Sequence, residues 1–191
     1  ARRAVSALPA DVEILTWGEP MGASVAREAG FDPEILGTPT ASETSATDTR
    51  AAVEAVVEAD VDLVLFVGGD GTAADVADAL AGTDVPMLGV PAGVKVYSSV
   101  FAISPEDAAD VVASYERTER REVLDIDEDE YRAGEIHPEL RAVADVPVGE
   151  HLQSSKQLGG GTVEALAAGV ADDVEPGVTY VIGPGSTVGA V

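Results

Sequence analysis

An apolar run that meets a glycine-rich turn is the feature that most constrains how this chain can fold. Residues 61–67 read VDLVLFV, and residues 68–72 continue as GGDGT. A nearly continuous apolar run suits a strand that is buried on both faces of a parallel sheet. After the turn, a helix is expected from about Thr72 to Leu80. The stretch therefore predicts one strand–turn–helix step of an α/β fold.

The same alternation of strands and helices continues on both sides of this step. Strands are expected at residues 12–17 (VEILTW) and 86–90 (PMLGV), and a small-residue helix is expected at 23–29. Strands that alternate with helices indicate a Rossmann-like, doubly wound parallel sheet. Capping residues mark two further helix starts. One helix, ending near Ala59, begins at Ser45, Thr47 and Asp48. The other begins at Ser104, Pro105, Glu106 and Asp107.

The pattern changes after residues 117–121. Residues 122–131 (EVLDIDEDEY) and 140–148 (LRAVADVPV) alternate apolar with polar side chains, as half-exposed antiparallel strands do. A last strand is expected at residues 178–182. We therefore expect an α/β domain over residues 1–118 and a smaller β-rich domain over residues 119–191. Because the chain stops just inside an expected helix, we also expect this second domain to be truncated.

The charge balance is strongly acidic, with 35 Asp and Glu against 11 Lys and Arg and a formal net charge of −24. The acids are dispersed over the whole chain, which is typical of a solvated surface and not of an acidic tail. Self-repulsion of this kind is tolerated where concentrated salt screens it, so we expect a halophilic, cytoplasmic protein. Nucleic acid and anionic membranes would be repelled, and neither is an expected partner.

Residue usage also limits the chemistry. The chain has no cysteine and only two histidines, so disulfides, thiolate metal sites and a zinc cluster are not expected. No run of about 18 apolar residues and no signal peptide are present. Lysine is reduced to Lys95 and Lys156, and in so lysine-poor a chain both positions call for a reason.

The glycine turn has the properties of an anion-binding loop. Gly68, Gly69 and Gly71 follow a parallel strand at the end of the sheet where open α/β folds bind ligands. Glycines allow backbone N–H groups to approach phosphate oxygens closely. The carboxylate of Asp70 would repel a phosphate, unless it orients a metal-bound nucleotide or accepts a proton from an attacking alcohol. The loop fits neither G-x-x-x-x-G-K-[ST] nor G-x-G-x-x-G.

Several of these features also admit a purely structural interpretation. Thr72 and Asp75 could form a T-x-x-D capping box, with the glycines only turning the chain. Lys95 could supply positive charge for phosphoryl transfer, or it could be an ordinary surface lysine. The loop GPGSTVG at residues 183–189 could be a second anion site or a plain helix-entry turn.

Two motifs together resemble a known superfamily. Residues 67–72 (VGGDGT) look like the GGDGT signature of the NAD kinase and diacylglycerol kinase superfamily, and residues 89–95 (GVPAGVK) resemble the GIPAGVK stretch of its AcoX-like ATP-NAD kinase branch. TAADV at 72–76, SSVFA at 98–102 and IGPGST at 182–187 also fit that branch, so the resemblance extends from about Thr44 onward. The Asn-Glu motif of ordinary NAD kinases is replaced by PAGVKVYSS, and the family's first strand and glycine-rich amino-terminal segment are not found.

The resemblance implies nucleotides bound in a cleft between an α/β domain and a β-rich domain, with Asp70 positioning or deprotonating the ribose 2′-hydroxyl of NAD. ATP or polyphosphate would be the donor, with Mg²⁺, and we expect small-molecule nucleotides as partners of a homo-oligomer. Two alternatives stay open, a kinase of another nucleoside, sugar or lipid alcohol and a non-catalytic nucleotide-binding regulatory module. The residues expected to hold the nucleotides are Gly68, Gly69, Gly71, Thr72, Pro91, Gly93, Lys95, Gly183, Gly185, Ser186 and Thr187.

Overall fold

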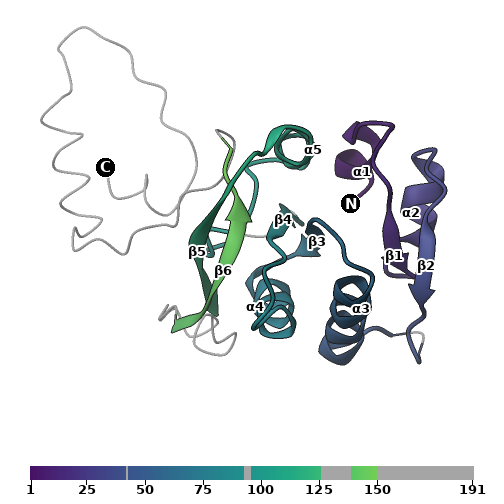
Figure 1. Cartoon of the computed structure of the whole chain (residues 1–191). Helices are drawn as coiled ribbons and strands as arrows, with labels where there is room; N and C mark the ends of the chain where they lie inside the picture. Colours follow the sequence, from purple (N-terminus) through teal and green to yellow (C-terminus); the bar gives the residue numbers. More distant parts are fainter. Residues whose placement is uncertain (42, 93–95, 126–138, 150–191) are drawn as a thin grey trace, which may run out of the picture. The chain divides into compact units, whose positions relative to one another are not determined.

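A computed structural model of the chain describes residues 1–41, 43–92, 96–125 and 139–149 (Figure 1). These residues all lie in the first of two units, Ala1–Ser155. The helices in this part of the chain are α1 Arg2–Ala7, α2 Ala23–Glu28, α3 Ala46–Glu58, α4 Asp70–Ala79 and α5 Pro105–Ser114. The strands are β1 Leu15–Trp17, β2 Glu34–Gly37, β3 Val64–Gly68, β4 Met87–Pro91, β5 Thr118–Asp125 and β6 Glu139–Pro147.

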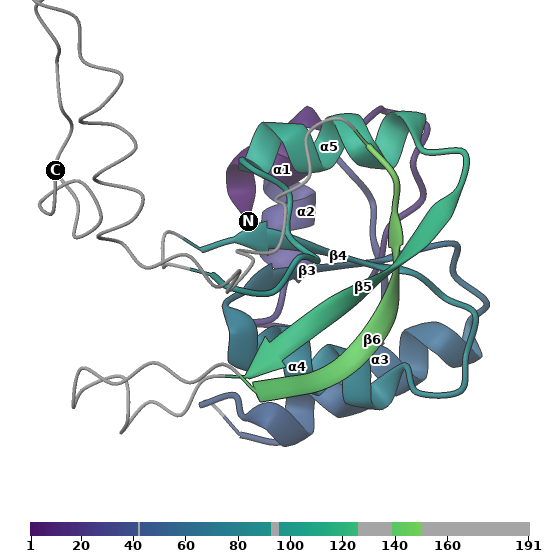
Figure 2. The same cartoon turned by 90° about the vertical axis from the view of Figure 1, so that its left-hand side faces the viewer.

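Within the described residues the strands form three two-stranded sheets. β1 pairs with β2 and β3 pairs with β4, both in parallel, whereas β5 and β6 form an antiparallel pair. Figures 1 and 2 show α1 and α5 on one side of β3 and β4, and α3 and α4 on the other side. Parallel strands covered by helices confirm the expected α/β class.

Three helix ends lie where local sequence signals place them. Ser45 and Asp48, two of the expected capping residues, form a capping box at the start of α3. The Ser104 hydroxyl accepts a hydrogen bond from the Asp107 N–H at 3.2 Å, and Pro105 is the first residue of α5. Gly30, with a φ of +96°, follows α2 as expected.

Other boundaries differ from the expected ones. β1 covers only the last three residues of the expected strand at 12–17, and α4 begins at Asp70 and not at Thr72. The sequence analysis predicted neither α1 nor β2. α1 has six residues, and its Arg2 and Arg3 form ion pairs with Glu28 and Glu106, so contacts with other helices support it.

The core lies between β3–β4 and the helices, and one aromatic pair crosses its centre. The rings of Phe66 and Phe101 meet edge to face, with centroids 5.4 Å apart. Gly89 of β4 lies against both rings, because a Cβ at this position would stand 2.4 Å from Phe101 Cδ1 and 2.8 Å from Phe66 Cζ. The backbone of Gly89 also pairs with the segment that carries Phe101, through a parallel bridge.

The hairpin of β5 and β6 contacts β4 and α4 (Figure 2). Its strands confirm the expected antiparallel pair, although β5 begins at Thr118 and not at Glu122. The expected boundary between residues 118 and 119 stays a prediction. In the described part of the chain no helix has the length and apolarity to cross a bilayer.

Candidate nucleotide site at the ends of two parallel strands

The glycine turn and the PAGVK stretch begin at the same end of one sheet. β3 and β4 run in parallel with five residues in register, and the last pair joins Gly68 to Pro91. Gly69 is the N-cap of α4, and Asp70 is its first residue. The positive end of the α4 dipole and its unpaired N–H groups therefore lie next to the carboxyl end of the sheet, which is where open α/β folds bind ligands.

The Asp70 carboxylate is held by the backbone that follows β4. Its Oδ1 accepts the Ser98 N–H at 2.8 Å, and its Oδ2 accepts the Tyr97 N–H at 2.9 Å. The Tyr97 N–H also reaches Oδ1 at 3.2 Å. A carboxylate offers about four acceptor positions, so these three contacts leave Asp70 with capacity for one further donor. The structure thus gives Asp70 a structural role that the sequence analysis did not find.

Residues 96–102 are buried along their whole length although they form no regular strand. On one side, the Gly89 N–H donates to the Val100 carbonyl at 2.8 Å, and the Ala102 N–H donates to the Gly89 carbonyl at 2.9 Å. On the other side, Ser98 and Ser99 bond to β5. Buried backbone groups need such partners. Asp70 supplies the acceptor for the Tyr97 and Ser98 amides of this segment.

Thr72 lies inside α4 and packs over the turn. A Cβ on Gly68 would stand 2.4 Å from Thr72 Oγ1, so this position has room only for glycine. By contrast, a Cβ on Gly71 would meet no atom within 4 Å. The alternative interpretation, a capping box of Thr72 with Asp75, is not formed, because α4 begins two residues before Thr72 with Gly69 as its N-cap. Asp75 instead forms an ion pair with Arg50 of α3 at 2.6 Å.

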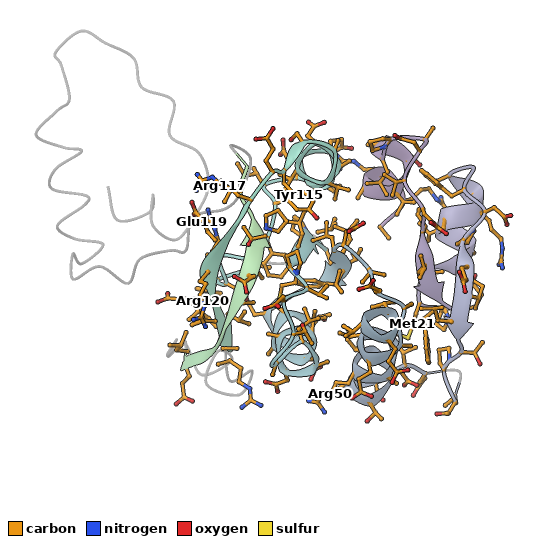
Figure 3. The ribbon with its side chains drawn as sticks, in the orientation of Figure 1. Met21, Arg50, Tyr115, Arg117, Glu119 and Arg120 are labelled. Atoms are coloured by element: carbon orange, nitrogen blue, oxygen red, sulfur yellow. The ribbon has the colours of Figure 1, made fainter. Side chains whose placement is uncertain are left out.

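Charged side chains of both signs also lie on α3 and at the start of β5. Figure 3 shows Arg50 on α3, Arg117 just before β5, and Glu119 and Arg120 on β5. Glu119 forms ion pairs with Arg117 at 3.3 Å and with Arg121 at 3.6 Å. Among the described residues, no group of three or more His, Cys, Asp or Glu side chains could hold a metal ion.

The structure brings some of the predicted site residues together. Gly68, Gly69, Asp70, Gly71, Thr72 and Pro91 lie around the ends of β3 and β4. The other predicted nucleotide-binding residues, Gly93, Lys95, Gly183, Gly185, Ser186 and Thr187, lie outside the described residues, as does Lys156. Sequence reasoning missed the roles of Tyr97 and Ser98, since backbone N–H groups carry no side-chain signal. Two consecutive serines in an otherwise apolar stretch were the available hint.

The comparison with known protein families agrees with this geometry. Residues 1–120 match the family described as ATP-NAD kinase N-terminal domain. The match includes the glycine turn, Asp70, β4 and the segment from Tyr97 to Ala102. A search of curated proteins and a search of solved structures each found no match.

Proposed function

The chain belongs to the NAD kinase family, and we propose that it transfers the terminal phosphoryl group of ATP to the 2′-hydroxyl of NAD, which gives NADP. The observation that carries this proposal is the position of Asp70. Asp70 is the first residue of α4, and two backbone amides of the segment after β4 hold its carboxylate. The carboxylate retains one acceptor position. A hydroxyl that donates to that position would be oriented for attack on a phosphoryl group.

The chain's own groups divide the work between charge and positioning. Backbone N–H groups at the start of α4 favour phosphate oxygens, and Gly71 leaves open space beside them. We infer that Asp70 orients the hydroxyl and receives its proton late in the transfer. Mg²⁺, when bound with the nucleotide, would neutralise charge on the phosphates. Lys95 would add a further positive charge.

We also propose the finer assignments that the residues suggest. The GVPAGVK stretch favours the AcoX-like branch of the family, and the net charge of −24 favours a cytoplasm with high salt in a haloarchaeon. Helices on both sides of β3 and β4 support a doubly wound parallel sheet (Figure 1). A second, β-rich domain over residues 119–191 would close the nucleotide cleft, and assembly into a homo-oligomer stays a prediction.

A second acceptor is favoured by one observation. The segment after β4 reads PAGVKVYSS where ordinary NAD kinases carry an Asn-Glu motif that grips NAD. The same fold and mechanism would then phosphorylate another nucleoside, sugar or lipid alcohol. A regulatory module that only binds nucleotides would not need the carboxylate of Asp70 for chemistry.

The test is a panel of acceptors with ATP and Mg²⁺ in molar KCl. NAD, NADH, nucleosides, sugars and a short-chain diacylglycerol are each incubated with the protein, and phosphate transfer is measured; polyphosphate replaces ATP in a parallel series. We expect NADP from NAD above every other product. If phosphate is transferred to a different alcohol, that alcohol and not NAD is the acceptor. Nucleotide binding with no transfer to any acceptor would favour the regulatory module.

A further inference from the structure

Ser98 connects Asp70 to strand β5. This residue is 2% exposed, and its Oγ donates to the Leu124 carbonyl at 3.1 Å and accepts the Leu124 N–H at 2.9 Å. In a β-sheet, the backbone N–H and carbonyl of a residue in the neighbouring strand would make these two bonds to Leu124. Here the Ser98 hydroxyl makes both of them. The N–H of the same residue donates to Asp70 Oδ1 at 2.8 Å. Ser98 therefore bonds both to Leu124, near the end of β5, and to Asp70, the first residue of α4.

We propose that Ser98 is a positioning residue, which fixes the orientation of the Asp70 carboxylate for the acceptor hydroxyl. This inference rests on the proposed function for its catalytic consequence, but its geometric part stands on the hydrogen bonds alone. The two bonds to Leu124 fix the position of Ser98, and therefore the direction in which its N–H points. The Asp70 carboxylate accepts this N–H best in one rotamer. Without the hydroxyl, residue 98 loses both of its side-chain hydrogen bonds to Leu124 of β5.

The neighbouring residue provides a matched control. Ser99 is also buried, at 5% exposed, and its Oγ donates to the Glu122 carbonyl of β5 at 3.2 Å. The Ser99 N–H donates to the same carbonyl at 3.1 Å, so the backbone keeps one bond to β5 when the hydroxyl is removed. The hydrogen bonds to Asp70 come from Tyr97 and Ser98. Ser98→Ala and Ser99→Ala thus remove the same atoms from similar surroundings, but only the first change acts on a donor to Asp70.

The geometric part is tested by amide hydrogen exchange in molar KCl, with no substrate present. We expect the N–H groups of Tyr97 and Ser98 to be protected in the wild type. In Ser98→Ala, and also in Asp70→Asn, they should exchange at least tenfold faster, whereas Ser99→Ala should leave them within about threefold of the wild type. Equal protection of these two amides in the wild type and in Ser98→Ala would overturn the link between Ser98 and Asp70.

The catalytic part is tested by a double-mutant cycle on the phosphorylation rate. We expect Ser98→Ala to lower kcat for NADP formation by about ten- to a hundredfold with little change in the KM for ATP, as misplacement of a reacting group does. In the Asp70→Asn background the same change should have almost no further effect, because a residue that acts through Asp70 has nothing left to position. A merely structural role would lower kcat in both backgrounds.

The outcomes separate this inference from the proposed function. A wild type that forms no NADP, but whose Tyr97 and Ser98 amides respond as described, would contradict the function and keep the geometric link. A wild type that forms NADP with equal kcat in Ser98→Ala and Ser99→Ala would keep the function and refute the positioning role.

Discussion

The Asp70 side chain has a structural role, as acceptor for two backbone amides, and a proposed chemical role, as acceptor for a substrate hydroxyl. Both of its oxygens accept backbone N–H groups from 27 and 28 residues further along the chain. A residue without a side-chain acceptor at this position would leave two amides of a buried segment unpaired, which costs about 1–3 kcal/mol for each group. A carboxylate that is already fixed in this way needs little reorganisation when an acceptor hydroxyl arrives. The two roles are therefore compatible.

Asp70→Asn separates these roles. The remaining amide oxygen can still accept the Ser98 N–H, but an NH₂ group would replace the oxygen that accepts the Tyr97 N–H at 2.9 Å. We expect the variant to fold with a free energy of unfolding lowered by about 1–3 kcal/mol. The rate of NADP formation should fall by roughly 10²- to 10⁴-fold. Turnover, nucleotide affinity and denaturant unfolding are measured side by side.

Asp75→Asn is the matched control, because it removes another α4 carboxylate, one that pairs with Arg50 away from the proposed chemistry. It should leave turnover near the wild-type value. Turnover of Asp70→Asn close to that of this control would end the catalytic role of Asp70. Loss of magnesium-nucleotide binding would instead assign Asp70 to holding the metal.

Gly89→Ala should disrupt the centre of the core. The new methyl group would stand 2.4 Å from Phe101 Cδ1 and 2.8 Å from Phe66 Cζ, so the aromatic pair has to move. Overpacking of this kind costs typically about 1–3 kcal/mol, which denaturant unfolding in molar KCl would report. Gly71→Ala serves as the stability control, since its methyl group would meet no atom within 4 Å. Equal stability of the two variants would contradict the close packing at Gly89.

At the scale of single elements, the sequence predicts what local signals determine. Ser45 with Asp48 and Ser104 with Asp107 predict the starts of α3 and α5, because a cap needs only residues three apart. The start of α4 was placed too late, since the contacts that fix Asp70 come from Tyr97 and Ser98, far along the chain. α1 was missed for a similar reason, as Arg3 and Glu106 lie 103 residues apart.

The cap of α3 makes a pH-dependent contribution to stability. Hydrogen bonds from the Ser45 backbone and hydroxyl lower the pKa of Asp48 below its usual value. A folded pKa below the unfolded value of about 3.9 means that the stabilisation is present above pH 4 and is lost as the pH falls through the folded pKa. Asp48→Ala should therefore destabilise the protein at pH 6 to 7, and the difference from the wild type should shrink at lower pH.

Denaturant unfolding across pH 3 to 7, in molar KCl, measures this difference. Glu54→Ala is the control, because Glu54 is an exposed acid on the same helix. At pH 7 the control should lose less stability than Asp48→Ala. A destabilisation by Asp48→Ala that stays constant over the whole pH range would show that the lost cap does not act through the carboxylate charge.

For the whole molecule, opposing electrostatic effects decide the response to salt. Ion pairs join α1 to α2, α1 to α5, α3 to α4 and α4 to β6, and salt should weaken them. Each exposed ion pair, however, stabilises the fold by only about 0–1 kcal/mol. The net charge of −24 over 191 residues destabilises the fold through repulsion among many acidic side chains. We expect relief of the self-repulsion to exceed the loss of the pairs.

Thermal unfolding between 0.1 and 3 M KCl tests which effect is larger. The Debye length is about 10 Å at 0.1 M and about 3 Å at 1 M, so most of the rise in melting temperature should occur within that interval. A sucrose series of equal osmolality is the control, because sucrose strengthens apolar burial without screening charge. A melting temperature that rises equally in sucrose, or that does not change between low and molar KCl, would remove the halophilic interpretation and leave the acidic surface without a salt-dependent role in stability.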